Sequence, residues 1–333
     1  MSKKFKLIPI AAAFLAFNIH AKVDTFTLAD LPVLKQESQH STASKRVTNF
    51  FTRAHYKLIQ LNDELSSQIL DRYIESIDYN RRVFLQSDID SFEKYRNSVD
   101  NALSTGKLDF TFDIFNLSLK RRFERYQYSL ALLETEMTFE QADDYLFDRE
   151  DLPWPKTTEE LNEIWRQKVK YDALRLKLTG KDWSEIKTIL EKRYSYTLKR
   201  LIQTNNEDAF QIAMNSFARS IEAHTSYLSP RRAEQFKMDM DLELEGIGAV
   251  LGYDEDYTVI RSLVPGGPAD KSEKIKANDR IIGVAQGDDK FVDVIGWRLD
   301  DVVELIKGPK GTTVKLQYLK GADAHGTPTV VEI

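Results

Sequence analysis

The sequence has no cysteine among its 333 residues. This absence excludes a thiol nucleophile, a disulfide framework and any metal site built on thiolates. An excess of positive charge is also missing, because 47 lysines and arginines are set against 52 acidic residues, for a formal net charge of −5. Domains that bind nucleic acids usually carry a basic excess, so nucleic acid is not an expected partner.

Long apolar runs are absent after the N-terminal region. The one run there extends from Leu7 to Phe17, follows three lysines and closes with Asn-Ile-His-Ala at residues 18–21. A basic segment, a short apolar stretch and a small residue are typical of a secretory signal peptide, which we expect to span residues 1–21 and to be cleaved after Ala21. An uncleaved anchor is the alternative, although a membrane span needs about 20 apolar residues. The mature chain is therefore expected to be exported.

Histidines are few and widely spaced, so their pattern indicates no metal site, and we expect no cofactor. The five are His20, His40, His55, His224 and His325. His224 is the most interesting, because Ser226 follows it closely. A hydrolase built on this pair is a minor alternative to a histidine that fixes a turn by hydrogen bonding.

A helical pattern extends from about residue 41 to residue 227, with apolar residues three or four positions apart. Ser41 and Thr42 are expected to cap the first helix, Gly106 to follow the end of a helix that opens at Ser87, and Thr157 or Thr158 to cap a later one. Phenylalanines at helical spacing are expected in the core, namely Phe50, Phe51, Phe92, Phe115, Phe123 and Phe217. Lys120, Arg121, Arg122 and Arg125 form a basic helix face, interpreted as salt-bridged and solvated, with a membrane or partner contact as the alternative.

The pattern changes at about Met238 to short β-rich runs separated by glycine and proline. Strands are expected at 249–252, 257–264, 279–285, 293–297, 312–319 and 328–333, with a turn at 265–269 and a short helix at 298–308. The predicted fold class is therefore a mainly α N-terminal domain at 22–237, followed by a small α+β domain at 238–333.

Two glycines interrupt the first β-rich run, Leu-Glu-Gly-Ile-Gly-Ala-Val-Leu at residues 244–251. Glycine weakens a strand, so its presence needs a reason. Glycine also adopts backbone conformations that turn successive N–H groups toward one point, and such a nest binds a carboxylate. The strand that follows would offer free backbone groups to an extended peptide. An ordinary bulge is the alternative.

Four segments of this region resemble a PDZ domain of the kind found in proteases: Gly246–Ala249, Val264–Asp270, Ala277–Val284 and Asp300–Thr312. The resemblance implies that the N–H groups of Ile247, Gly248 and Ala249 hold a peptide's terminal carboxylate. It also implies a small, partly open β-barrel in which one helix lines a groove. The implied peptide-binding residues are Gly246, Ile247, Gly248, Ala249, Val250, Leu251, Leu299, Val302, Val303 and Ile306.

The rest of the mature chain resembles bacterial tail-specific proteases, a branch of the carboxy-terminal processing peptidases. The matching segments are 31–57, 120–134, 176–181, 201–210 and 221–236. These enzymes are serine endopeptidases with a serine–lysine dyad, which the family carries in a domain after the PDZ domain. No serine or lysine here matches the dyad, so no catalytic residue is assigned. The chain is expected to lack the protease domain, to end within the C-terminal edge of the PDZ domain and to be inactive alone.

The resemblance implies the N-terminal and PDZ portion of a periplasmic endopeptidase that recognises proteins by apolar free C-termini. Expected partners are the C-terminal tails of misfolded, tagged or precursor periplasmic proteins. A lipoprotein adaptor built from helical repeats and peripheral association with the inner membrane are further implications of the resemblance. A tail-binding adaptor without catalysis and a helical interaction scaffold remain alternatives.

Overall fold

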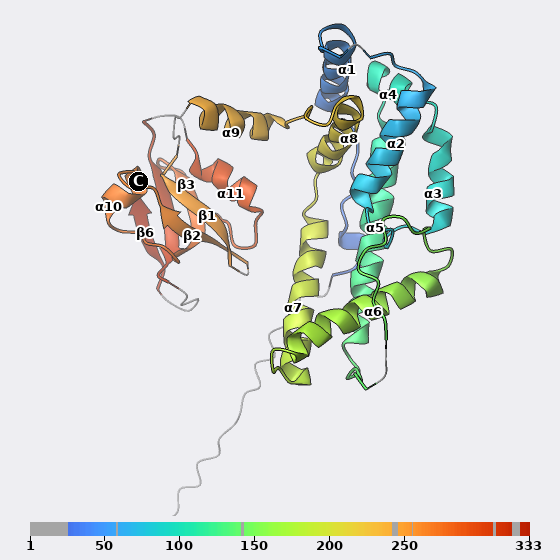
Figure 1. The fold of residues 1–333 in the computed structure, drawn as a ribbon. Coiled ribbons are helices and arrows are strands. Elements are labelled where there is room, and N and C mark those ends of the chain that lie inside the picture. The colour runs from blue at the N-terminus through green and yellow to red at the C-terminus, as the bar shows by residue number, and fades with distance from the viewer. Residues whose placement is uncertain are drawn as a thin grey trace, which may run out of the picture. The chain divides into compact units, whose positions relative to one another are not determined.

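The computed structural model describes residues 26–57, 59–140, 143–241, 246–254, 256–308, 311–321 and 327–333. The expected signal peptide, His325 and the first two residues of the 244–251 run lie outside these ranges. The chain divides into two compact units, Met1–Ala223 and His224–Ile333 (Figure 1). Each unit is described by itself.

All regular elements among the described residues of the first unit are helices, as the 3.6-residue pattern predicts. Its elements are η1 (Leu28–Asp30), α1 (Ser38–Arg53), α2 (Asp63–Ile77), α3 (Gln86–Phe92), η2 (Glu93–Tyr95), α4 (Val99–Thr105), α5 (Asp109–Leu132), α6 (Thr158–Lys177), α7 (Trp183–Ile202) and α8 (Asn206–Ile221). The 24-residue helix α5 contacts α2, α6, α7 and α8. It is therefore the element on which the rest of the unit is organised.

The core of this unit consists of the apolar faces that the sequence pattern predicts. Five of the six phenylalanines expected there are buried: Phe51, Phe92, Phe115, Phe123 and Phe217. The sixth expectation is wrong, because the side chain of Phe50 is 57% exposed. Adjacent helix positions point about 100° apart, so α1 cannot turn both Phe50 and Phe51 toward the core.

Helix ends follow local hydrogen-bond chemistry. Gly106 follows α4 in the left-handed conformation (φ 70°), and the Thr157 hydroxyl accepts a bond from the N–H of Glu160 at the start of α6, which confirms both predictions. The predicted cap at Ser41 and Thr42 is wrong, since α1 begins at Ser38. The Thr42 hydroxyl instead donates to the Ser38 carbonyl within the helix, at 3.2 Å.

The helix expected from Ser87 to Leu103 is divided into α3, η2 and α4. The division has a physical cause, because the N–H of Val99 donates to the hydroxyl of Ser66 on α2, at 2.8 Å. A side chain of another helix thus replaces the carbonyl that a continuous helix would have supplied. Such a contact joins residues far apart in sequence, so helical periodicity does not reveal it.

The basic face expected on α5 is only partly solvated. Lys120 is exposed, and Arg121 donates to the carboxylate of Asp88 through two bonds of 2.8 Å. Arg125 is buried, and its guanidinium donates to the side-chain oxygen of Asn162. The interpretation as a solvated face is therefore wrong for Arg125, which helps to join α5 to α6.

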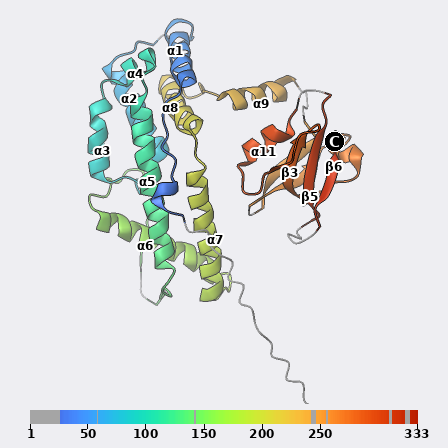
Figure 2. The ribbon, with the colours of Figure 1, turned by 180° about the vertical axis from the view of Figure 1, so that it is seen from behind.

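The second unit contains an antiparallel sheet with helices. Its elements are α9 (Pro230–Asp241), β1 (Ala249–Asp254), β2 (Tyr257–Leu263), α10 (Pro268–Ser272), β3 (Arg280–Gln286), β4 (Val292–Asp293), α11 (Leu299–Ile306), β5 (Val314–Leu319) and β6 (Thr329–Glu332). The strand order is β1-β2-β3-β5-β6, and β4 also pairs with β3. Figure 2 shows β3, β5 and β6 side by side. The predicted combination of a helical region and a small α+β domain is confirmed.

Two details of this unit differ from the expectation. Of the run at 293–297 only Asp293 lies in a strand, the two-residue β4, because a turn follows in which the N–H of Trp297 donates to the carbonyl of Val294. Helix α9 spans residues 230–241 and so crosses the boundary expected at 237/238. The contact pattern assigns all of α9 to the second unit.

Candidate functional site

The loop before β1 contains both glycines that the sequence singles out. Gly246 has φ 113° and Gly248 has φ 70°, values that side-chain-bearing residues rarely adopt. A β-carbon built on Gly246 would meet no atom closer than 3.8 Å. Gly246 is thus required for its backbone conformation and not for space.

Gly248 has a second constraint in addition to its conformation. A β-carbon at this position would lie 3.2 Å from the α-carbon of Gly267 and 3.3 Å from Cδ of Pro268. These residues lead into α10, so the loop packs closely against the start of that helix. The glycine therefore permits both the turn and the close contact.

The carbonyl groups of the loop are occupied. The Ile247 carbonyl accepts from the N–H of Ala269, and the Gly248 carbonyl accepts from the N–H of Val264, both at 2.8 Å. Within the described ranges, no acceptor is found for the N–H of Ile247 or that of Gly248. When successive residues alternate in backbone conformation, their N–H groups point into one small hollow. Such a group of N–H donors is suited to bind an anion.

Strand β1 follows the loop directly and lies at one edge of the sheet, where it pairs with β2. Its residues alternate as in a strand with one face on the core. Ile247, Ala249 and Leu251 pack with the core cluster, while the side chain of Val250 is exposed. The outer edge of β1 can accept a further strand through its backbone groups.

Helix α11 contacts both β1 and β3. Val302 and Ile306 are buried in the same core cluster as Ile247, whereas Leu299 and Val303 are half-buried. The four α11 residues that the sequence predicts for the site thus divide into two groups. Val302 and Ile306 support the helix from beneath, and Leu299 and Val303 are the ones with surface to offer a ligand.

Two further contacts hold α11 in place, and neither follows from the sequence motifs. The hydroxyl of Tyr253, in β1, accepts a hydrogen bond from the N–H of Leu299, the first residue of α11. Arg231 on α9 donates to the carboxylates of Asp301 and Glu304 on α11. The position of Tyr253 could have been predicted, because the alternation Ile247, Ala249, Leu251, Tyr253 puts it on the strand face toward α11. No local sequence pattern indicates the ion pairs of Arg231.

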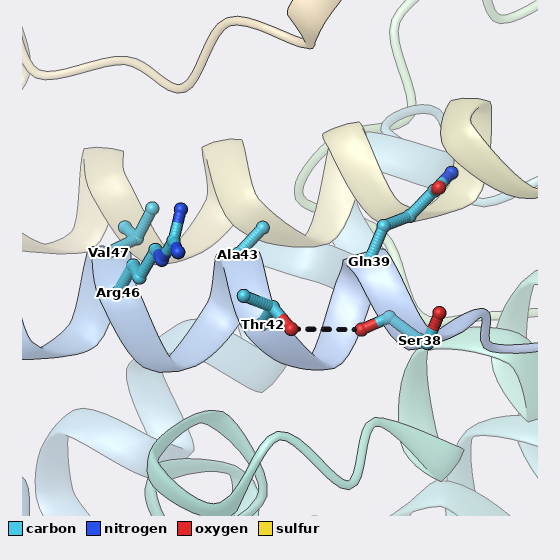
Figure 3. Close-up of a pocket in the computed structure, with 6 residues that line it drawn as sticks. All are labelled: Ser38, Gln39, Thr42, Ala43, Arg46 and Val47. Carbon is cyan, nitrogen blue, oxygen red and sulfur yellow. Dashed lines mark hydrogen bonds between the residues drawn. The ribbon is translucent and has the colours of Figure 1, made fainter.

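A hollow on the first unit offers less chemistry. It lies along one face of α1 and is lined by Ser38, Gln39, Thr42, Ala43, Arg46 and Val47 (Figure 3). Its lining has neither a carboxylate nor a histidine, and the Thr42 hydroxyl is bonded to its own helix. The hollow therefore has no general base, and a hydrolytic site is not indicated there.

The described ranges show neither a metal site nor a membrane span. The described residues contain no group of three or more His, Asp or Glu side chains placed to hold a metal ion. No helix in the described part of the chain combines the length and apolar character that crossing a bilayer needs. The loop at 246–249 and the edge of β1 thus remain the strongest candidate site.

Comparison with known protein families gives two matches along the chain. The tail-specific protease N-terminal domain model matches residues 47–231, and the PDZ domain model matches residues 235–319. The second match contains the glycine loop, β1 and α11.

Individual relatives agree with these matches. Tail-specific protease of Haemophilus influenzae is 45% identical over 309 residues, which are 92% of this chain and 44% of that protein. Carboxy-terminal processing protease CtpA of Bacillus subtilis is 30% identical over 130 residues, 38% of this chain and 27% of its own length. The chain thus spans less than half the length of these curated relatives.

One solved structure among the matches is a PDZ domain of the carboxy-terminal protease from Vibrio cholerae in complex with a peptide. It is 59% identical, covers 27% of this chain and 91% of its own, and has a TM-score of 0.26.

Proposed function

The chain belongs to the tail-specific protease family, and we propose that its PDZ domain binds the free C-termini of substrate proteins. The observation that carries this proposal is the pair of N–H groups at Ile247 and Gly248, which have no acceptor among the described residues and lie beside the edge strand β1. A C-terminus supplies both matching parts, a carboxylate for the loop and an extended backbone for the strand edge.

The loop selects a free terminus through charge-assisted hydrogen bonds. Each such bond contributes about 1.5–3 kcal/mol, because the carboxylate is ionised and the donors are fixed in place. An amidated terminus has no negative charge and presents an N–H₂ group to the same donors. Losing one bond alone weakens binding by about tenfold or more.

Calorimetric titration with two peptides tests the proposal directly. The peptides share one sequence that ends in small apolar residues and differ only in a free or an amidated terminus. We expect the acid to bind at least tenfold more tightly than the amide. Equal affinities would overturn the carboxylate-binding role.

A pair of glycine variants locates the binding to the loop. Gly248→Val should remove binding of the acid, because a β-branched residue resists positive φ and has no room against Gly267. Gly287→Val, in the turn after β3, imposes a similar positive φ where no atom lies within 4 Å, and serves as the control. A folded Gly248→Val protein with normal affinity would contradict the assignment.

We further propose that cleavage belongs to the full-length family protein, with a serine nucleophile activated by a lysine. Support comes from the membership of this chain in the family and from the 44% share of the Haemophilus relative that it spans. The chain by itself is proposed to bind tails without cutting them. Mass spectrometry of a tail peptide incubated with the repurified chain should show no cleavage, and product formation would contradict this part.

Export to the periplasm is proposed from the N-terminal residues alone. The lysines at 3, 4 and 6 and the apolar run Leu7 to Phe17 support a signal peptide that ends at Ala21. N-terminal sequencing of the protein from a periplasmic fraction should begin at Lys22. Recovery with residues 1–21 still attached would contradict cleavage.

A further inference from the structure

The far end of β1 carries an apolar feature that terminal-carboxylate binding does not use. Between β4 and α11 lie two large exposed side chains, Ile295 at 42% and Trp297 at 40% exposure. They flank Gly296, while Val294 just before them is fully buried. We call Ile295 and Trp297 the apolar rim.

Hydrogen bonds tie the rim to the end of β1 remote from the glycine loop. The Gly296 N–H donates to the carbonyl of Asp256, in the turn after β1, at 2.6 Å. The Tyr253 hydroxyl lies 3.4 Å from the Trp297 carbonyl oxygen and also accepts from the Leu299 N–H. The backbone of the rim is thus held beside Tyr253, and its side chains remain available.

The direction of a bound tail determines which of its residues reach the rim. A peptide with its carboxylate at Gly248 extends along β1 from Ala249 toward Asp254, five residue steps away. At about 3.3 Å per residue this distance is about 17 Å. The residue about five positions before the terminus therefore lies level with Tyr253 and Asp254, and the preceding residues pass the rim.

We propose that the apolar rim is an additional subsite for the extended chain that precedes a substrate's last residues. This inference rests on the proposed function and names its substrate class: tails that are unfolded and apolar from about the fifth to the seventh residue before the terminus. An exposed tryptophan next to a peptide-binding edge supplies a large contact area at low entropic cost. Only a tail without folded structure reaches both the loop and the rim.

The apolar rim is continuous with the edge of β1, which favours a substrate tail as its ligand over a second copy of this chain. Hydrogen bonds at Gly296, Trp297 and Leu299 all lead to β1 or to the turn that follows it. A chain already bound along β1 needs no change of direction to meet Ile295 and Trp297. Binding there adds contact area without a second encounter, as for any linked pair of sites.

Two dye-labelled peptides with free carboxyl termini test the subsite on the full chain by fluorescence anisotropy. Both end in the same five residues, and the three residues before them, the fifth to the seventh before the last residue, are leucine in one peptide and serine in the other. We expect the leucine peptide to bind about tenfold more tightly. The double variant Ile295→Ser/Trp297→Ser should remove this preference, so that the ratio of the two affinities falls to about one.

Val330→Ser is the matched control, because Val330 is 51% exposed on β6, at the opposite edge of the sheet. It should retain the tenfold ratio. If the unmodified chain binds the leucine and serine peptides equally well but still prefers the free terminus to the amidated one, the subsite proposal is wrong and tail binding stands. Persistence of the ratio in the double variant also overturns it.

Two other outcomes are informative about the same surface. If sedimentation velocity shows a dimer that Trp297→Ser dissociates, the rim is a self-association surface and the subsite proposal is wrong. If neither acid peptide binds, the proposed function itself fails and the subsite fails with it. The anisotropy ratios and the acid–amide comparison therefore separate the two claims.

Discussion

Gly248 and Gly267 approach each other so closely that a β-carbon on either would have to displace its neighbour by a few tenths of an ångström. A β-carbon on Gly248 would lie 3.2 Å from the α-carbon of Gly267, and one on Gly267 would lie 3.3 Å from the α-carbon of Gly248. The contact holds the loop at 246–249 against the start of α10, where the Ile247 carbonyl accepts from the N–H of Ala269, while the Gly248 carbonyl accepts from the N–H of Val264 just after β2. Two small residues from different motifs thus fix one binding loop.

Three alanine variants separate the two constraints on this loop. Gly248→Ala combines positive φ with a tight contact to Gly267 and Pro268. Gly287→Ala has positive φ (50°) in open space, and Gly267→Ala has an ordinary φ of −71° with a tight contact alone. A left-handed residue costs about 1–2 kcal/mol and overpacking about 1–3 kcal/mol. We expect Gly248→Ala to lower the free energy of unfolding of the PDZ domain most.

Urea denaturation of each variant checks this order. Trp297 fluorescence reports unfolding of the second unit when the other tryptophans, Trp154, Trp165 and Trp183, are changed to phenylalanine. Gly267→Ala should also weaken binding of the acid peptide, since it displaces the loop, whereas Gly287→Ala should not. Equal stability losses for Gly248→Ala and Gly287→Ala would show that the close contact carries no energy.

The helical unit depends on one buried carboxylate. Asp78 follows α2 and accepts hydrogen bonds from the N–H groups of Arg82, Val83 and Phe84 and from the indole of Trp154, at 2.9–3.1 Å. Asp78→Asn places a donor group among four donors, so at least one bond is lost. We expect a loss of about 1–3 kcal/mol in the free energy of unfolding.

Urea denaturation followed by far-ultraviolet circular dichroism measures the effect of Asp78→Asn. Asp90→Asn is the control, because Asp90 is exposed and accepts a hydrogen bond from the nearby side chain of Gln86. That exposed change should stay within about 0.5 kcal/mol of the unmodified chain. Comparable losses for the two variants would contradict the structural role of Asp78.

Alkaline pH should destabilise the helical unit through its buried tyrosines. Burial raises the pKa of the Tyr73 phenol well above its usual value of 10.0. Below pH 10 the phenol is neutral in both the folded and the unfolded state, so its contribution to stability is constant. Above pH 10 only the unfolded state releases the proton, and stability falls by up to about 1.4 kcal/mol per pH unit for this group.

Denaturation midpoints between pH 9 and pH 11 test this effect. Tyr73→Phe should show a smaller decline with pH than the unmodified chain. The control Tyr56→Phe removes a phenol that is 80% exposed, and it should leave the decline unchanged. Identical slopes in Tyr73→Phe and the unmodified chain would show that Tyr73 ionises equally in both states.

Much of the architecture was predictable because it follows from local patterns. The 3.6-residue spacing indicates the helices of the first unit. The cap at Gly106 comes from the left-handed conformation that glycine allows, and the cap at Thr157 comes from a side-chain hydrogen bond within one turn. The alternation before and after Gly248 similarly indicates β1. In each case the physical cause lies within a few residues of its effect.

The features that sequence patterns missed depend on contacts between distant segments. Ser66 ends the helix expected at 87–103 from a position 33 residues away, and Arg231 reaches α11 across 70 residues. The partner of Gly248 in the binding loop, Gly267, belongs to another motif. Among the peptide-binding residues that the sequence predicts, Val302 and Ile306 are buried, and burial of this kind depends on the packing of α11 against distant strands.

Amide chemical shifts measure the central claim most directly. With ¹⁵N-labelled chain and an unlabelled peptide that has a free carboxyl terminus, the account predicts large downfield shifts of the Ile247 and Gly248 amide protons, because each gains a charged acceptor. The amidated peptide should leave both in place. If the acid peptide binds and shifts other amides while Ile247 and Gly248 remain unmoved, the loop does not hold the carboxylate and the account is wrong.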